Sequence, residues 1–281
     1  MDGILLIKKP IGMTSRDVVN KLMKKFNTNK VGHTGTLDPF ASGLLIITIN
    51  KGTKISSFIE HLDKEYIAEL KLGAKTTTLD LEGEVIETKE VKLPLDKNDV
   101  INAMNSFIGE IEQIPPMYSA IKINGEELYK KARRGEEVKR EPRKVTINNI
   151  QMLSLTKDLI IFSTSCSRGT YIRTLGEDIA NKIGYPGHLT MLTRTRIGGY
   201  SLKNAKTIEE VSENDVISIC DALKHMPTII VEGRDEFKAR NGVKMKLTGH
   251  DTYLIKTRSN QAIAIYQRKE DNYYYCLRGL L

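Results

Sequence analysis

Extended segments dominate this chain, and they follow one another without a helix between each pair. Residues 65–72 alternate in polarity with period two, as a half-buried strand does. Residues 145–155 and 159–165 are predicted to form a strand pair, and residues 190–200 return to an extended state. Because doubly wound folds separate successive strands by helices, this order predicts an α+β fold with a mixed, largely antiparallel sheet.

Helical periodicity recurs at four places between these strands. Ser15 precedes an amphipathic stretch at 16–23 and is expected to be the N-cap of that helix. Further helices are expected near residues 53–61, 100–108 and 175–183. We expect these to be the helices that flank the sheet.

The segment from Gly32 to Pro39 packs one imidazole, two glycines and one carboxylate into eight residues, directly before an apolar run at 43–49. This density of Gly, Thr, Asp and Pro predicts a loop that presents side chains from a strand edge. Its glycines let the backbone approach a ligand closely, and Pro39 fixes how the chain leaves Asp38. Taken alone, the loop is more typical of an ordinary turn in which Asp38 caps its own backbone.

Composition is that of an ordinary soluble globular protein. The 281 residues are 40% hydrophobic and 28% charged, which suffices for one large domain and a small one. Its three cysteines are scattered, which argues against a disulfide framework or zinc site and favours a reducing cytosol. The N-terminal apolar run at 4–7 is too short for a signal peptide or membrane span. We therefore expect a cytoplasmic protein without membrane contact.

The net charge of +8 is concentrated in two segments. Residues 121–144 hold nine Lys/Arg against five Glu, and residues 230–281 hold ten Lys/Arg against six Asp/Glu. Concentrated positive charge suggests a polyanion contacted at two places, most simply nucleic acid. On charge alone, a solvated lysine-rich surface explains these counts equally well.

The same two segments differ in pattern from the rest of the chain. Residues 121–144 are predicted to be a basic insertion that projects from the body and is helical around 126–134. Beyond residue 228, short alternating stretches with Gly punctuation predict a small C-terminal β-barrel. The expected division is therefore a domain at 1–228 and a second one at 229–281.

Sequence motifs of cofactor chemistry are absent from this chain. The stretch from Gly73 to Thr76 lacks the spaced first glycine of a P-loop, and no G-x-S-x-G, H-E-x-x-H or paired-cysteine motif occurs. By elimination, a reaction built on side chains, with no cofactor and no metal, is favoured.

Seven ordered blocks carry a resemblance to a known family. The central one is Gly-His-Thr-Gly-Thr-Leu-Asp-Pro at 32–39, which runs into Ser42 and Gly43. The others lie at 6–15, 64–68, 79–83, 113–120, 166–175 and 192–198. With these blocks, over roughly residues 4–226, the chain closely resembles the bacterial tRNA pseudouridine synthase B family. Enzymes of that family isomerise uridine 55 in the T-arm of tRNA.

The resemblance implies three catalytic residues. Asp38 matches the catalytic aspartate, and a carboxylate can act as nucleophile or stabilise a cationic sugar when the C1′–N1 bond breaks. Arg173 matches the arginine that pairs with it, and an adjacent guanidinium would hold Asp38 ionised and oriented. Tyr66 matches the tyrosine placed to stack on the target base. Without the family match, Arg173 is more typical of a surface helix start and Tyr66 of strand packing.

The resemblance also implies a set of substrate-binding residues. His33 matches the residue that fills the gap left when the target nucleotide leaves its stack, although a lone His could equally be a general base or a metal ligand. Arg194 and Arg196 would be available to RNA phosphates. The full set is His33, Lys9, Asp80, Leu192, Arg194 and Arg196.

The expected partner is tRNA, bound by its T-arm, and the protein is expected to act as a monomer without an obligatory protein partner. The basic insertion would form a flap on the T-arm, and the C-terminal unit resembles a PUA-type RNA-binding module. Two alternatives remain: a non-catalytic tRNA-binding or tRNA-folding protein, and a guide-dependent pseudouridine synthase.

Overall fold

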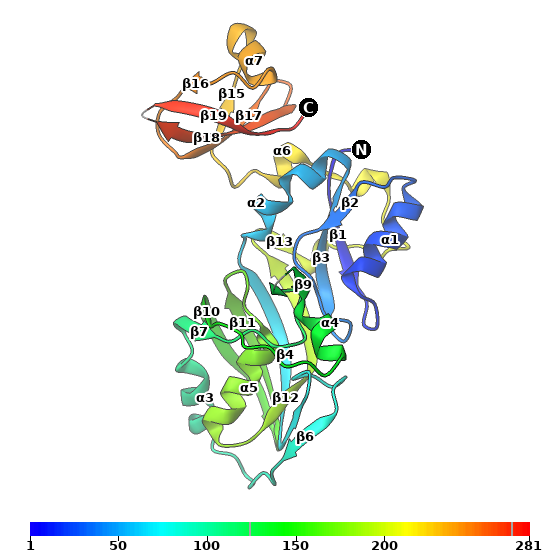
Figure 1. The fold of residues 1–281 in the computed structure, drawn as a ribbon, viewed down its shortest axis with the longest axis vertical. Helices are drawn as coiled ribbons and strands as arrows, with labels where there is room; N and C mark the ends of the chain where they lie inside the picture. The colour runs from blue at the N-terminus through cyan, green and yellow to red at the C-terminus, as the bar shows by residue number, and fades with distance from the viewer. Residues whose placement is uncertain (124, 271) are drawn as a thin grey trace.

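A single mixed sheet forms the body of the protein in the computed structural model, which describes residues 1–123, 125–270 and 272–281 (Figure 1). Its main path runs β14-β1-β3-β12-β4-β11-β10-β7, with β13 paired to β12 and β2 to β3. All of these pairs are antiparallel except β3 with β12. The predicted mixed, largely antiparallel sheet is thus confirmed. In path order the strands are β14 (Ile217–Ser218), β1 (Gly3–Lys9), β3 (Ser42–Ile49), β12 (Gly187–Ile197), β4 (Lys64–Leu72), β11 (Leu159–Cys166), β10 (Arg143–Thr156) and β7 (Gly109–Gln113), followed by β13 (Tyr200–Ser201) and β2 (Val31–His33).

Strand β4 lies between β11 and β12 and shows the period-two burial that its sequence predicts. Its inward residues, among them Ala68 and Leu70, join an apolar core with helices α3 (Lys97–Asn105) and α5 (Ile172–Ile183). Both helices cover the same face of this half of the sheet (Figure 1). The opposite faces of β1 and β3 support two further cores.

Helix α1 (Ser15–Lys25) begins one residue earlier than the sequence suggested, and the prediction of Ser15 as its N-cap is wrong. Thr14 is the cap: its hydroxyl accepts from the Asp17 amide at 3.0 Å, and the Asp17 carboxylate accepts from the Thr14 amide at 3.0 Å. This reciprocal capping box satisfies two orphan donors of the first turn. The Ser15 hydroxyl is therefore left for the loop at 32–39.

The helix expected near 53–61 is split into a 3-10 helix, η1 (Asn50–Ile55), and a short α2 (Ser56–Glu60). A hairpin of β5 (Ala74–Thr76) and β6 (Val85–Thr88) carries the turn that contains Asp80. The remaining short helices are η2 (Leu202–Asn204), η3 (Glu213–Asp215) and α6 (Ile219–Ala222). None of the helices in the described ranges is long and apolar enough to cross a membrane.

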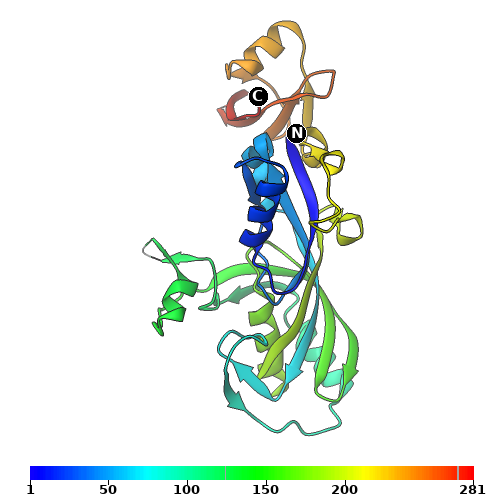
Figure 2. The same ribbon diagram turned by 90° about the vertical axis from the view of Figure 1, so that its right-hand side faces the viewer.

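The basic insertion projects from the body, as Figure 2 shows. It contains β8 (Lys122–Ile123), β9 (Glu126–Glu127) and helix α4 (Leu128–Arg133), so it is partly helical as predicted. Position 124, which falls in the predicted insertion, and position 271, which falls in the predicted C-terminal unit, lie outside the described residues.

The C-terminal unit is a curled five-stranded sheet in the order β15-β17-β18-β19-β16. In the described part of this unit, the edge strands β15 and β16 do not pair with each other, so the sheet is open where a closed barrel was expected. It also contains a helix, α7, that the sequence pattern did not predict. The elements are β15 (Thr228–Ile230), α7 (Gly233–Arg240), β16 (Met245–Lys246), β17 (Thr252–Lys256), β18 (Ala262–Glu270) and β19 (Tyr273–Gly279).

Apolar side chains join this unit to the body. Leu254, Ile265 and Leu280 belong to the same buried cluster as Ile4 and Ile55. The C-terminal sheet therefore packs against the end of the body that carries the N-terminus and α6 (Figure 1).

Gly43 is the point at which β3 meets β12 in parallel register with Arg194, and we predict that Gly43→Ala destabilises the protein. An added Cβ would lie 2.3 Å from the Arg194 carbonyl oxygen, and the residue has a φ of +112°. We expect a loss of about 2–4 kcal/mol in the free energy of unfolding, measured by urea denaturation.

Gly109→Ala is the matched control, because Gly109 has a φ of +109° but nothing within 4 Å of the added Cβ. The free energy of unfolding should fall by only about 1 kcal/mol, the cost of a positive φ for a residue with a side chain. Equal losses in the two variants would contradict the role assigned to the β3–β12 contact.

Candidate active site

A cavity of about 310 Å³ opens on the body at the point where several distant segments converge. The loop at 35–38, strand β4, the start of α5 and strand β12 all contribute to its lining. Of the site residues predicted from the sequence, the cavity brings together five: Asp38, Tyr66, Arg173, Leu192 and Arg194.

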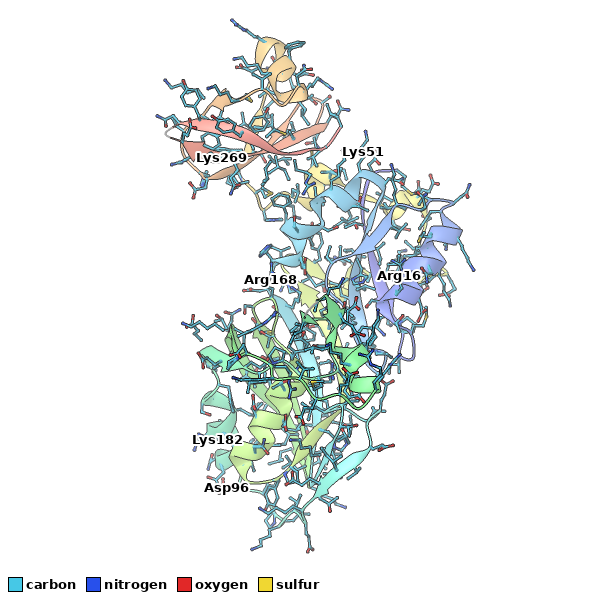
Figure 3. All side chains as sticks on the ribbon, viewed as in Figure 1. Arg16, Lys51, Asp96, Arg168, Lys182 and Lys269 are labelled. Carbon is cyan, nitrogen blue, oxygen red and sulfur yellow. The ribbon has the colours of Figure 1, made fainter. Side chains whose placement is uncertain are left out.

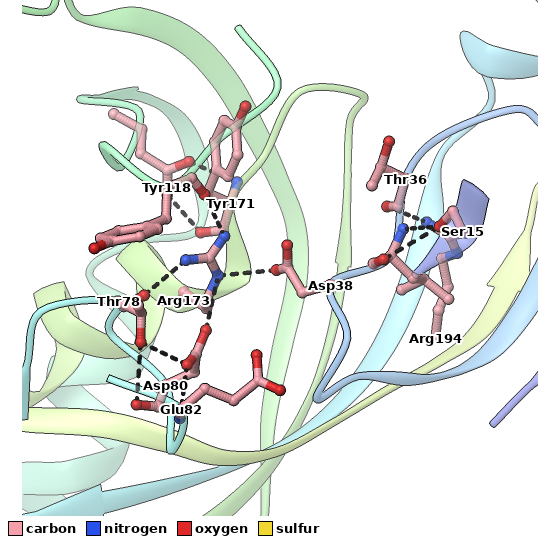
Figure 4. Close-up of polar contacts among 12 residues, drawn as sticks. Ser15, Thr36, Asp38, Thr78, Asp80, Glu82, Tyr118, Tyr171, Arg173 and Arg194 are labelled. Carbon is pink, nitrogen blue, oxygen red and sulfur yellow. Dashed lines mark hydrogen bonds and ion pairs between the residues drawn. The ribbon is translucent and has the colours of Figure 1, made fainter. Parts of the chain in front are cut away.

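Arg173 is the centre of this arrangement, with a side chain that is only 4% exposed. Its Nε donates to Asp38 Oδ2 at 2.9 Å, and its two terminal nitrogens donate to the carbonyls of Thr78 at 2.7 Å and Tyr118 at 2.8 Å (Figure 4). One guanidinium therefore bonds to three segments: the loop at 32–39, the β5–β6 turn, and the segment at Tyr118 that leads into the insertion. Its planar fork of donors suits this task, which a lysine could not perform.

Gln113 fixes the start of the helix that carries Arg173. Helix α5 has no side-chain cap at its first residue, and Gln113 takes over part of that task. The side-chain amide of Gln113 donates to the Tyr171 carbonyl at 3.1 Å and accepts from the Tyr171 amide at 2.7 Å. Because Gln113 ends β7, the sheet edge sets the position of Arg173.

Asp80 approaches the same guanidinium from the β5–β6 turn. Its Oδ2 lies 3.6 Å from Arg173 Nε, and its Oδ1 accepts from the Thr78 hydroxyl at 2.6 Å and from the Glu82 amide at 3.0 Å. Burial raises the pKa of Asp80, and the Thr78 hydrogen bond and the Arg173 charge oppose that rise. Arg173 thus faces two carboxylates, of which Asp38 is the one open to the cavity, at 34% exposure.

Tyr66 comes from the centre of the sheet and is buried against the apolar core. Burial raises the pKa of the Tyr66 hydroxyl, so the phenol keeps its proton at neutral pH. It pairs in register with Arg194 of β12, and both residues line the cavity. The ring therefore offers an apolar face beside Asp38.

Arg194 supports the loop at 32–39 from behind, and this differs from the phosphate contact expected of it. The residue is 1% exposed. Its Nε donates to the Leu44 carbonyl at 2.8 Å, and its terminal nitrogens donate to the carbonyls of Thr36 at 3.4 Å and Gly35 at 3.1 Å. These bonds join β3, β12 and the loop, so the guanidinium serves the protein's own backbone.

Comparison with known proteins adds to this geometry. Residues 23–172 match the family model described as TruB family pseudouridylate synthase (N terminal domain). The chain belongs to the TruB family. It is 42% identical over 286 residues to a tRNA pseudouridine synthase B of Bacillus subtilis (strain 168), covering 95% of this chain and 93% of the relative. It is 46% identical over 278 residues to one of Alkaliphilus oremlandii (strain OhILAs), covering 96% and 91%.

Solved structures share the fold of this TruB-family chain. A chain of a Cbf5-Nop10-Gar1 complex matches with a TM-score of 0.73 at 23% identity, covering 96% of this chain and 79% of that one. A chain of an H/ACA RNP bound to a substrate RNA containing 2'-deoxyuridine matches with a TM-score of 0.75 at 20% identity, covering 99% and 85%. At these identities the likeness concerns the fold alone.

Lys9 lies behind the loop of this TruB-family chain and outside the cavity lining. It is fully buried, and its ammonium donates to the carbonyls of Pro10 at 2.9 Å, Met13 at 2.5 Å and Pro39 at 3.4 Å. Burial lowers the pKa of Lys9 to about 8. These three bonds join the β1–α1 loop to the residue that follows Asp38.

Ser15 completes the support of the same loop. Its hydroxyl accepts from the Leu37 amide at 2.8 Å and donates to the Leu37 carbonyl at 3.1 Å. Both bonds are buried, so they are worth more than they would be at the surface. Asp38 is therefore presented by a loop that Ser15, Lys9 and Arg194 hold from three sides.

The other predicted site residues lie around the cavity rather than in its lining. His33 ends β2, opposite Ile47 of β3, and its Nδ1 is buried without a hydrogen-bond partner. Burial lowers the pKa of His33, so its ring is neutral at pH 7. Arg196 is half-exposed and lies 3.8 Å from Glu65 Oε1.

Sequence reasoning missed several charged or aromatic residues that line the cavity, namely Glu60, Lys64, Arg143, Arg168 and Tyr171. A signal was present for Lys64, because period two in β4 places it on the same face as Tyr66. Lys64, Arg168 and Tyr171 also belong to blocks that carried the family resemblance. Arg143 gave no signal of its own, because it stood at the end of a long basic segment.

We predict that Arg173→Met destabilises the protein by about 3–5 kcal/mol at pH 7, because it leaves the buried Asp80 carboxylate and the partly exposed Asp38 carboxylate without their cation. In the variant the pKa of Asp80 rises further. A folded-state pKa above the unfolded value makes stability fall as pH rises, so the loss should be smaller at pH 5 than at pH 7. Urea denaturation at both pH values measures this.

Arg196→Met is the control, since it removes an exposed guanidinium, and its effect should stay within about 0.5 kcal/mol. A loss for Arg173→Met that is independent of pH would contradict the coupling between Arg173 and Asp80.

Proposed function

We propose that this protein isomerises uridine 55 of the tRNA T-arm to pseudouridine, without a cofactor. The observation that carries the proposal is an ionisable carboxylate, Asp38, open to a cavity and bonded to a buried arginine, Arg173. The relatives at 42% and 46% identity bear the name tRNA pseudouridine synthase B. The reaction breaks a C1′–N1 bond, turns the uracil and joins C5 to C1′, so it is balanced without an external reactant.

Asp38 is proposed to act on the ribose as an anion. Attack on C1′ and abstraction of a sugar proton both require the ionised carboxylate. Arg173 Nε donates to Asp38 Oδ2 at 2.9 Å, so the guanidinium holds that oxygen. Oδ1 then remains for the reaction. The Tyr66 ring would stack on the uracil and, as a protonated phenol, could donate a hydrogen bond during rotation.

A duplex or loop base reaches this cavity only if it leaves its stack. Flipping costs a few kcal/mol, and an inserted planar ring recovers part of that. We assign this insertion to His33, whose neutral ring stands at the end of β2, five residues before Asp38. Lys9 and Asp80 would then act indirectly, by placing Asp38 and Arg173.

The RNA-binding surface is proposed to include the insertion. Fewer of its residues are expected to contact RNA than its nine Lys and Arg residues would suggest. Most of its Lys and Arg side chains already form ion pairs with acidic residues. For example, Arg134 pairs with Glu126 and Glu136, and Lys130 pairs with Glu127. Arg133, Arg143 and Arg168 are exposed, and none of them forms an ion pair with a described carboxylate. Arg168 lies on the body beside the cavity (Figure 3). We assign phosphate contacts to these three arginines and to Arg196.

The C-terminal unit is proposed to be a PUA-like RNA-binding domain at 229–281, following a catalytic domain at 1–228. Its net positive charge and position beside the body support a second contact with tRNA. We further propose that the protein acts in the cytoplasm as a monomer. The identity to relatives named for tRNA favours this stand-alone mode over the guide-dependent one.

We predict that Asp38→Asn abolishes catalysis but not tRNA binding. The purified protein is incubated with an unmodified tRNA transcript that carries tritium at C5 of uridine. Joining C5 to C1′ releases that tritium, so the wild type should release it and Asp38→Asn should fall at least about 1,000-fold. Asp235→Asn, an exposed change in the C-terminal unit, is the matched control and should keep full activity.

Retained tRNA binding with no tritium release by the wild type would overturn the proposed function and support a non-catalytic tRNA-binding protein. Release that depends on an added guide RNA would support the guide-dependent alternative.

We predict a steep salt dependence of tRNA affinity that rests on few arginines. Replacing Arg133 and Arg143 by Gln should lower the slope of log affinity against log salt by about 2, because each phosphate contact contributes about one. Filter binding at several salt concentrations measures the slope. Lys97→Gln with Lys182→Gln removes the same charge from helices α3 and α5 and should leave the slope nearly unchanged. Equal changes in both double variants would contradict the assignment.

A further inference from the structure

Two buried cations beside the cavity lack a carboxylate partner. Lys64 is 6% exposed, and its ammonium donates to the carbonyls of Glu60 at 2.9 Å and Leu62 at 2.7 Å. The hydrogen bonds of Arg194 described above go to the backbone carbonyls of Leu44, Thr36 and Gly35. Among the residues that the structure describes, no carboxylate oxygen lies within 4.0 Å of either charge. Buried charges are normally paired, so this arrangement requires an explanation.

The two cations stand side by side under the catalytic loop. A Cβ built on Gly35 would lie 3.6 Å from Lys64 Cε and 3.7 Å from Arg194 Nη1. Like charges this close repel each other, and Arg194 is one of the causes that lower the pKa of Lys64, after burial. By contrast, the charge of Arg173 is offset by two carboxylates. In the cavity lining, Arg173 is therefore paired with carboxylates, whereas Lys64 and Arg194 have no carboxylate within ion-pair distance among the described residues, although Glu60 also lines the cavity.

Lys64 has a donor left for a ligand. An ammonium carries three N–H groups, and two of them are used by backbone carbonyls. Lys64 lines the same cavity as Asp38 and lies two residues before Tyr66 on β4, so both side chains are on one face of the strand. A flat ring stacked on Tyr66 would lie within reach of that donor.

The isomerisation creates an anion at this place. When the C1′–N1 bond breaks, its electron pair stays on N1, and the uracil becomes an anion whose charge spreads over N1, O2 and O4. The ribose carbon is then held by Asp38 or has lost a sugar proton to it. The uracil must stay in the cavity and turn until C5 faces C1′, and C5 loses its proton after the new bond forms.

We propose that Lys64 and Arg194 form an anion site that stabilises the uracil released in this step. Lys64 contacts the ring and is a catalytic residue; Arg194 adds positive potential from behind the loop. The inference rests on the proposed function. Preorganised positive groups in a site that excludes water are effective because they need no rearrangement when charge develops.

A phosphate group of the RNA is the other anion that these cations could meet. Phosphates lie on the outside of the nucleic acid, where exposed arginines such as Arg143 and Arg168 stand. Lys64 is buried deeper, next to the ring of Tyr66 rather than at the rim. The geometry therefore favours the base over the backbone.

The first test replaces Lys64 by Met in the full chain and measures single-turnover pseudouridine formation on a tRNA transcript. We expect a loss of about 100-fold in rate, as for removal of one donor from an oxyanion site, with the Kd for tRNA changed less than about twofold. Lys182→Met, at an exposed position on α5, is the control and should match the wild type. A phosphate contact would instead weaken tRNA binding and leave the rate at saturation unchanged.

A substrate with a more acidic leaving base sharpens this test. Fluorine at C5 of uridine stabilises the uracil anion and cannot leave as a proton, so the reaction can be followed by loss of the glycosidic bond in nuclease digests. Lys64→Met should then be slowed about tenfold or less. Equal losses on uridine and 5-fluorouridine would overturn the proposal.

The pH dependence supplies a readout that survives if Lys64→Met does not fold. Burial, followed by the charge of Arg194, lowers the pKa of Lys64 to about 8. The wild-type rate should therefore fall as pH rises through 8, whereas Lys64→Arg stays charged and should lack that fall. The pKa of Cys166 is raised to about 11 and that of Tyr66 is also raised, so neither titrates there.

Other charges near Lys64 are common to both proteins. Glu60 and Asp63 are present in both proteins, and Lys9, with a pKa of about 8, faces the back of the loop. The ratio of the two profiles therefore reports Lys64 alone, and identical profiles would overturn the proposal. If the wild type forms no pseudouridine, the proposed function fails; if it does and Lys64→Met is equally fast, only this inference fails.

Discussion

The active site depends on one buried guanidinium. Arg173, whose side chain is 4% exposed, binds the Asp38 carboxylate and two carbonyls that belong to segments far apart in the chain. A buried hydrogen bond to a charged group is worth more than one at the surface, and leaving a partner unmatched is expensive. The loop at 32–39, the β5–β6 turn and the segment at Tyr118 that leads into the insertion must therefore all be in place together. Placement of the insertion is coupled in this way to the orientation of Asp38.

The sheet makes this convergence possible. Strand β12 pairs in parallel with β3 and antiparallel with β4, so it brings Arg194 under the loop that precedes β3 and next to Tyr66 on β4. The glycine at position 43 allows the two backbones to meet there. Behind the loop, Lys9 and Ser15 add donors from β1 and the first turn of α1. Hydrogen bonds from Lys9, Ser15 and Arg194 to the loop backbone thus fix the position of the Asp38 carboxylate.

Local patterns in the sequence predicted what local physics decides. The alternation of β4 and the periodicity of α5 survive in the structure because each faces one apolar core. The resemblance anticipated that Arg173 would stand beside Asp38. The spacing of Thr14 and Asp17 is a local capping-box pattern that the prediction of Ser15 as the cap overlooked. The sequence could not show that Ser15 bonds Leu37, which lies 22 residues away. Helix α7 was also missed, because it is short and only weakly amphipathic in a segment dominated by strands.

The charged residues illustrate the same limit. The sequence gives their number in a segment, whereas the fold determines their burial and their ion-pair partners. The insertion was predicted to bind RNA because it holds nine Lys and Arg residues. Several of these form ion pairs with neighbouring glutamates, so they contribute little to the attraction of a polyanion. Lys64 and Arg194 add only two charges, but the fold removes them from water and places no described carboxylate within 4.0 Å of either. Exposed pairs at the surface contribute little free energy, whereas an unpaired buried charge acts strongly on whatever enters its cavity. The position of a charge, which only the tertiary structure sets, therefore determines whether it binds RNA, supports a loop or stabilises a reacting base.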